Sequence, residues 1–220
     1  LGDAHGPGLV LTERAWFNQN LQSRWFIISA LGGIISMVVV MILTGLSVAR
    51  EREFGTFDQL LVAPFTPVEI LIGKTVPGML FGLLDALIFS LGAILWFGVP
   101  FRGTVSALIL VLSCFLLAMV GVGLLVSSLS KTMQQALLGS FVFMMPAVIL
   151  AGFTTPIENM PEWLQMGTRI NPVRYIIKGL RRIFLEGADT SMIWPQIWPL
   201  LIMAGVALPA AAWLFRHRSE

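Results

Sequence analysis

The chain has 220 residues, of which 56% are hydrophobic and 12% are charged, and its mean hydropathy is +0.85. Ordinary soluble domains carry about 25% charged residues, so this composition excludes a soluble globular protein. The formal net charge of +2 gives no indication of nucleic-acid binding, and we expect no nucleic-acid partner. Because there is a single cysteine, and the two histidines lie at opposite ends of the chain, the sequence predicts neither an intrachain disulfide nor a metal centre.

Residues 1–25 are predicted to form an extracytoplasmic or interfacial lead-in segment. Residues 1–12 are rich in glycine, and the stretch that follows mixes polar and aromatic side chains, including Trp16 and Trp25. Tryptophan is enriched at the level of lipid headgroups, so we interpret these side chains as anchors before the first span. The distribution of Lys and Arg leaves the orientation in the membrane open.

Long windows almost free of charge predict an all-α membrane protein whose transmembrane domain covers residues 26–220. A hydrocarbon core needs about 20 apolar residues per helix. The windows allow about five spans, at residues 26–48, 75–97, 104–126, 135–151 and 193–215.

One carboxylate, Asp85, interrupts the second span. It lies eleven residues beyond Lys74, and a rise of about 1.5 Å per residue places it near the middle of the bilayer. Ionisable groups at that depth are costly and usually functional, so Asp85 is a candidate for an intramembrane polar site. The alternative is that Asp85 only forms a hydrogen bond with a neighbouring helix.

The stretch from Arg50 to Pro64 is predicted to form a short amphipathic helix over residues 50–63. Its charged side chains fall mostly off an apolar stripe formed by Phe54, Phe57, Leu60 and Leu61. Pro64 and Pro67 are expected to end it. A helix this short and charged lies at the membrane surface, either as a connector that only contacts lipid or as a docking surface.

A second amphipathic helix is predicted in the polar interval between residues 152 and 190. Asn171 and Pro172 are typical of a helix N-cap followed by proline, and Gly187 is expected to mark the end about 14 residues later. One face carries the apolar side chains. The other face is basic, with Arg174, Lys178, Arg181 and Arg182.

Four sequence pieces together resemble the permease subunit of type 2 ABC exporters of the multidrug or lipid kind. The most specific is Val48–Pro64, which contains Arg-Glu-Arg-Glu-Phe-Gly-Thr. Supporting pieces are Trp16–Asn20, Glu69–Lys74 and Asn171–Tyr175, and their order and spacing also fit.

The resemblance implies that residues 50–64 form a cytoplasmic coupling helix, which rests in a groove of a separate ATPase subunit. The residues carried over to this ATPase-coupling role are Arg50, Glu51, Arg52, Glu53, Phe54, Gly55, Thr56, Phe57, Leu60 and Leu61. It further implies that residues 156–186 form an outer interfacial helical hairpin. The residues expected there are Asn171, Pro172, Arg174, Tyr175, Lys178, Arg181 and Arg182.

The resemblance also implies partners. The family's first helix and a large extracytoplasmic domain would lie upstream of Leu1, so this chain would correspond to helices two to six. Two permeases, as a homo- or heterodimer, pair with two ATPases in the inner (plasma) membrane of a bacterium, as a multi-pass efflux system in contact with membrane lipid. The sequence contains no Gly-x-x-x-x-Gly-Lys-Ser/Thr loop, so ATP and Mg are expected on the partner. We therefore expect no catalytic residue and no cofactor in this chain, which would not itself be an enzyme.

The main alternative is a secondary transporter or channel subunit that uses Asp85 in an intramembrane path. Such a protein needs ionisable groups along the path, and Asp85 alone is little for a proton relay. An intramembrane enzyme would need a nucleophile with a base or a metal cluster, and no such constellation stands out in the sequence.

Overall fold

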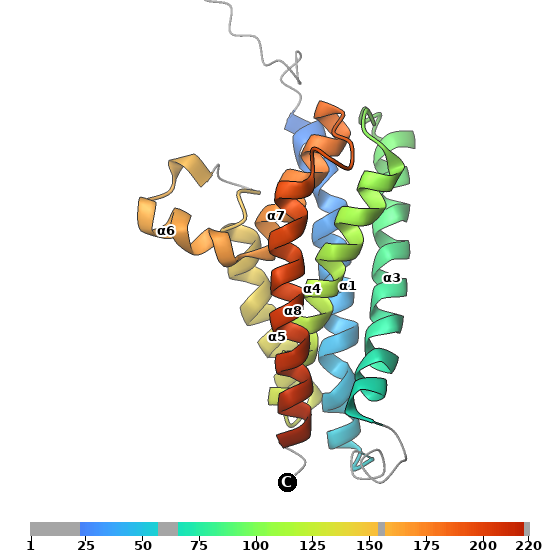
Figure 1. Ribbon diagram of the computed structural model, residues 1–220, viewed down its shortest axis with the longest axis vertical. Helices are drawn as coiled ribbons and strands as arrows, with labels where there is room; N and C mark the ends of the chain where they lie inside the picture. Colours follow the sequence, from blue (N-terminus) through green and yellow to red (C-terminus); the bar gives the residue numbers. More distant parts are fainter. Residues whose placement is uncertain (1–22, 57–65, 154–156, 218–220) are drawn as a thin grey trace, which may run out of the picture.

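The computed structural model describes residues 23–56, 66–153 and 157–217, which are helical and contain no strand (Figure 1). The helices are α1 (Ser23–Glu53), α3 (Pro67–Leu95), α4 (Val105–Leu129), α5 (Met133–Ile149), α6 (Glu162–Gly167), α7 (Pro172–Arg181) and α8 (Trp194–His217). Two 3-10 turns, Ile157–Asn159 and Thr168–Ile170, flank α6, and a π-helical turn, Arg182–Glu186, continues α7. The expected all-α membrane fold is confirmed.

Four helices in the described part of the chain are long and apolar enough to cross a membrane. Their candidate spans are Trp25–Glu53, Glu69–Leu95, Val105–Leu129 and Trp194–Phe215. The fourth of the five expected spans corresponds to α5, which has only 17 residues and so lies at the lower limit of about 17–25 residues for a span. Pro146 lies inside α5, as expected.

The start of α3 differs from the expected start of the second span at residue 75. Pro67 was expected to end the preceding helix, but it occupies the first turn of α3 instead. The hydroxyl of Thr66 accepts a hydrogen bond from the Glu69 backbone N–H, and the Glu69 carboxylate accepts one from the Thr66 N–H at 2.7 Å. This capping box begins the helix eight residues early and places Lys74 inside it.

The long helices run side by side with their ends gathered at two levels (Figure 1). At one level, which we call the Glu53 end, lie the end of α1, the start of α3, the α4–α5 turn and the end of α8. At the other, the Trp25 end, lie the start of α1, the π turn and the start of α8.

Helix α4 lies at the centre of the bundle, in contact with α1, α3, α7 and α8. Its side chains Val111, Phe115 and Met119 are fully buried. At Gly121 a Cβ atom would lie 2.8 Å from the Ala207 Cβ and 3.2 Å from the Leu208 backbone nitrogen of α8. The two backbones can approach this closely only because both contact residues are small, which is how helices associate where lipid removes the hydrophobic drive.

The apolar face of α7 is covered by protein. Val173, Ile176 and Leu180 are buried at 0–1% exposure, and the expected position of this helix at the outer interface stays a prediction. Ile176 and Leu180 contact α1 at Gly33, where an added Cβ would lie 2.9 Å and 3.0 Å from them. An amphipathic pattern identifies the face that leaves water, but it does not tell whether lipid or protein covers that face.

The basic side chains of this region contact protein as well. Arg174 donates to the Gln165 carbonyl oxygen and to the Thr168 hydroxyl, and Arg182 pairs with Glu186 at 3.3 Å. Tyr175 donates its hydroxyl to the Arg169 carbonyl oxygen at 2.8 Å. These contacts tie α7 to the segment around α6 and to its own C-terminal turn.

Both ends of the predicted amphipathic helix are confirmed. The Asn171 side chain accepts a hydrogen bond from the Val173 N–H at 3.0 Å and donates one to the Ala147 carbonyl oxygen of α5 at 2.6 Å. Gly187 follows the π turn with φ +77°, a left-handed conformation that favours glycine.

The arrangement of the two ends predicts opposite labelling of cysteines placed at Thr56 and Thr190. Both residues are exposed. Thr56 bonds to the last turn of α1 at the Glu53 end, and Thr190 lies four residues before the start of α8, at the Trp25 end. In a Cys114→Ala background, a membrane-impermeant thiol reagent added to intact cells should label one of the two, and should label the other only in inverted vesicles. Labelling of both from one side would contradict the bundle.

The α4–α8 contact predicts that Gly121→Ala destabilises the protein by about 1–3 kcal/mol, because the new methyl group meets backbone that cannot move away. Gly92→Ala is the matched control, since an added Cβ there has nothing within 4 Å. Alanine also favours a helix over glycine by about 1 kcal/mol, so this control should not lose stability. Thermal unfolding in detergent measures both, and equal behaviour would contradict the close contact.

Candidate functional site

The last turn of α1 carries the Arg-Glu-Arg-Glu motif, and it is not a separate helix. Residues 50–53 continue α1 without a break, so the expected helix boundary at Arg50 is wrong. The chain leaves the helix at Gly55, which has φ +70°. The Gly55 N–H donates to the Arg52 carbonyl oxygen and the Thr56 N–H to the Glu51 carbonyl oxygen, which is a Schellman motif. Phe57, Leu60 and Leu61 lie outside the described residues.

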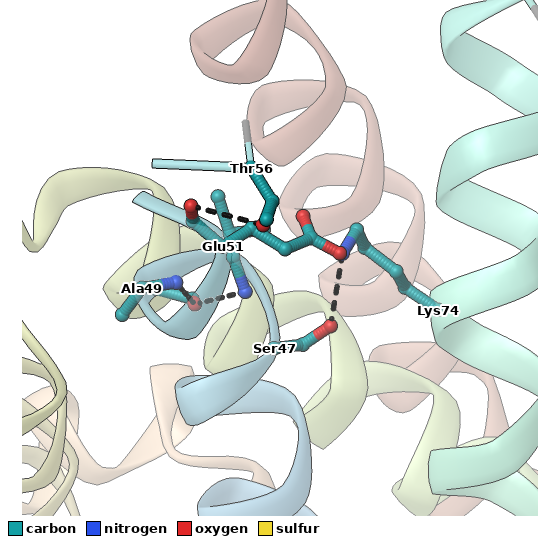
Figure 2. Close-up of polar contacts among 7 residues, drawn as sticks. Ser47, Ala49, Glu51, Thr56 and Lys74 are labelled. Carbon is teal, nitrogen blue, oxygen red and sulfur yellow. Dashed lines mark hydrogen bonds and ion pairs between the residues drawn. The ribbon is translucent and has the colours of Figure 1, made fainter. Parts of the chain in front are cut away.

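Glu51 connects α1 to α3 (Figure 2). Its carboxylate lies 2.7 Å from the Lys74 ammonium group, and the Ser47 hydroxyl accepts a second hydrogen bond from Lys74 at 3.2 Å. The Lys74 side chain is 11% exposed and the Glu51 side chain 26%. The pair therefore joins, near their ends, the two helices that flank the segment between residues 54 and 66.

Arg52 connects α1 to the end of α4. Its Nη1 donates to the Ser128 carbonyl oxygen at 2.8 Å and to the Ser130 carbonyl oxygen at 3.4 Å. The last carbonyl groups of a helix have no partner within the helix and form the negative end of its dipole. A guanidinium group placed there satisfies these groups and complements their charge.

Glu53 connects α1 to the start of α5. Its carboxylate accepts a hydrogen bond from the Met133 N–H at 2.6 Å, and the Thr132 hydroxyl caps the same helix start by accepting from the Gln135 N–H. The first N–H groups of a helix form its positive end, so a carboxylate is the matching group.

We call Ser47, Glu51, Arg52, Glu53 and Lys74 the Glu53 cluster. Three of the four charges on the last turn of α1, those of Glu51, Arg52 and Glu53, each contact a different helix: α3, the end of α4 and the start of α5 respectively. One turn below, the Ser127 hydroxyl of α4 accepts from both the Val48 and the Ala49 N–H, at 2.9 and 3.0 Å. A displacement of this turn would therefore act on three neighbouring helices at once.

The surface of the turn beyond these contacts is exposed. Phe54 is 66% exposed, and Arg50, Gly55 and Thr56 are exposed as well. A large aromatic side chain in this position is suited to insert into a pocket of another protein. Arg52 contacts the end of α4 and Glu53 contacts the start of α5, so both already have partners within the chain, and their expected role in coupling to an ATPase stays a prediction.

Sequence reasoning missed the residues that α1 contacts. Lys74 was used only as a reference point for Asp85 and as the end of a supporting piece, and the polar stretch from Ser127 to Thr132 was given no role. Arg52 and Glu53 contact backbone groups of that stretch and of Met133, which no side-chain pattern reveals. The polar stretch between two predicted spans could have indicated these partners. A turn between two helices exposes carbonyl groups at the end of the first helix and N–H groups at the start of the second.

Asp85 lies on α3, half-buried against α1. Its carboxylate accepts a hydrogen bond from the Ser36 hydroxyl at 3.2 Å. Ser36 is fully buried and also lies 2.6 Å from the Gly32 carbonyl oxygen. The contact corresponds to the simpler of the two interpretations, in which Asp85 forms a hydrogen bond with a neighbouring helix.

A bundle of helices, four of which are long and apolar enough to cross a membrane, defines the described part of the chain as a multi-pass membrane protein. The chain belongs to the ABC-2 type transporter family, whose pattern matches residues 8–185. It is therefore a permease-type chain of the bacterial inner membrane.

The chain is similar to several curated permeases. It is 44% identical over 208 residues to the "Probable multidrug ABC transporter permease YbhR" of Escherichia coli, which covers 94% of this chain and 56% of the relative. It is 35% identical to the "Probable multidrug ABC transporter permease YbhS" of the same organism, over 99% of this chain and 58% of the relative. The "Linearmycin resistance permease protein LnrN" of Bacillus subtilis is 26% identical over 80% of this chain. The chain thus spans somewhat more than half the length of the first two relatives.

The burial of the Glu51–Lys74 pair predicts that Glu51→Gln destabilises the protein by about 1–3 kcal/mol, since a hydrogen-bonded charge loses its partner. Glu186→Gln is the matched control, because the Arg182–Glu186 pair is 35% and 39% exposed, and exposed pairs contribute about 0–1 kcal/mol. Thermal unfolding of the purified protein measures both. The exchange Glu51→Lys with Lys74→Glu should recover part of the loss, and a further loss in the double variant would contradict the pairing.

Proposed function

We propose that the chain is the translocation subunit of an ATP-driven exporter and that a separate ATPase drives it through residues 50–64. The observation that carries this proposal is the Glu53 cluster, which links one exposed turn to α3, α4 and α5. The names of the relatives support the transporter part of the proposal.

The proposed mechanism requires a contact with the partner ATPase and a helix bundle that can pack in two alternative arrangements. When the partner binds ATP and Mg and closes, it displaces the docked turn at Phe54. The displacement passes through Glu51 to α3, through Arg52 to α4 and through Glu53 to α5, and the helices repack around a path between two permeases. Because rigid helices move as units, no catalytic residue is needed in this chain.

The partners follow from the same proposal. A working exporter contains a second permease, either the same chain or a related one, and two ATPase subunits. The substrate class is inferred to be apolar or amphipathic small molecules, since the spans offer almost no charge along a path. The alternative, a secondary transporter based on Asp85, is less well supported because Ser36 already binds the carboxylate.

Docking through Phe54 predicts that Phe54→Ala lowers the affinity for the ATPase by about tenfold or more, because truncating a central aromatic anchor typically costs above 1 kcal/mol. The exposed side chain contributes little to the fold, so the variant should insert and unfold like the original. The measurement is the binding of a separately purified ABC ATPase that co-purifies with the original chain, together with ATPase activity in reconstituted vesicles.

Trp163→Ala is the matched control, since Trp163 is 74% exposed and belongs to α6, remote from the Glu53 end. It should leave ATPase binding unchanged. Unchanged binding and coupling in Phe54→Ala would contradict the docking proposal.

A further inference from the structure

Arg181, the last residue of α7, lies against the start of α1 at the Trp25 end (Figure 1). Its guanidinium carbon lies 3.3 Å from the centre of the Phe26 ring. Its Nε donates to the Phe26 carbonyl oxygen and its Nη1 to the Gly152 carbonyl oxygen, both at 3.4 Å. The side chain therefore lies at the junction of α1, α7 and the segment that follows α5.

The charge of Arg181 has no counter-ion in the described part of the chain. The ion pairs found there are Lys74–Glu51 and Arg182–Glu186. Burial lowers the pKa of Arg181 to about 10, which is still well above neutrality, so the group remains charged. Face-on contact with an aromatic ring offsets only part of the cost of a desolvated cation.

The hydrogen-bonding capacity of Arg181 is also incompletely used. A guanidinium group has five N–H donors. Two of them contact carbonyl oxygens at 3.4 Å, beyond the usual upper limit of about 3.2 Å, and Nη2 is buried with no acceptor among the described residues. A planar set of unused donors on a cation matches a phosphate group, which accepts two parallel hydrogen bonds.

The surroundings indicate where such a phosphate would come from. Trp25 and Trp194 lie near the start of α1 and of α8, at this same end, and tryptophan is enriched at headgroup level. Phe26 and Ile27, beside the arginine contact, are each 42% exposed and apolar. A ligand with a phosphate group next to acyl chains satisfies the guanidinium and covers these side chains together.

We propose that Arg181 binds the phosphate group of an anionic lipid headgroup at the junction of α1, α7 and Gly152. The lipid supplies the missing counter-charge and joins the start of α1 to the end of α7. The site is independent of the Glu53 cluster, which lies at the opposite end of the bundle.

Native mass spectrometry of the purified full chain, with phosphatidylglycerol and phosphatidylcholine added together, tests the proposal. The original protein should retain phosphatidylglycerol with about a tenfold preference, the value of one or two charge-assisted hydrogen bonds. Arg181→Gln should abolish the preference. Lys178→Gln is the matched control, because it removes the same charge from the exposed face of α7 and should leave the preference intact.

Two further measurements separate lipid binding from a folding defect and from binding of free phosphate. Arg181→Lys keeps the charge but loses the planar donors, so it should fold even if Arg181→Gln does not, and its preference should fall. Inorganic phosphate at millimolar concentration should not displace the lipid. An unchanged preference in Arg181→Lys or Arg181→Gln, an equal loss in Lys178→Gln, or displacement by inorganic phosphate would each overturn the lipid site.

Discussion

The charges on the last turn of α1 are the contacts on which the arrangement of the Glu53 end depends. A helix leaves four N–H groups at its start and four carbonyl groups at its end without partners in the helix. At the turn between α4 and α5 these opposite ends lie next to each other. Arg52 meets the carbonyl end and Glu53 the N–H end, so two neighbouring residues of opposite charge satisfy both ends of one turn.

The rest of the bundle is held by close packing of small residues. Between apolar helices in lipid there is no hydrophobic drive, and stability comes from van der Waals contact and interhelical hydrogen bonds. Gly121 allows α4 to meet α8, Gly33 allows α1 to meet α7, and Ser127 bonds the backbone of α1. Such contacts are specific but short in range, so a small displacement separates them, which is compatible with the proposed repacking.

The fold class and the helices could be predicted from the sequence because uncharged windows are a strong signal for spans. The start of α3 was readable too, since Thr66-Pro67 followed by Glu69 is a capping box with proline in the first turn, but the prolines were interpreted only as helix breakers. The sequence could not predict what packs against the apolar face of α7, because Ile176 and Leu180 form the same pattern whether they face lipid or α1. The partners of Arg52 and Glu53 could not be predicted either, since they are backbone groups of a turn 75 to 80 residues away.

The assignment of charges within the motif also limits how a partner can recognise this chain. Glu51, Arg52 and Glu53 are each in contact with another helix of the same chain, so a docking protein that took them over would release α3, α4 or α5. Recognition without such release must use the exposed groups that have no contact with another helix, of which Phe54 is the largest and Arg50 carries a charge. Under the proposed docking, the exposed aromatic side chain provides affinity, while the charges paired within the chain transmit movement without being exchanged. A motif of alternating charges would then matter less for binding the ATPase than for connecting its movement to the spans.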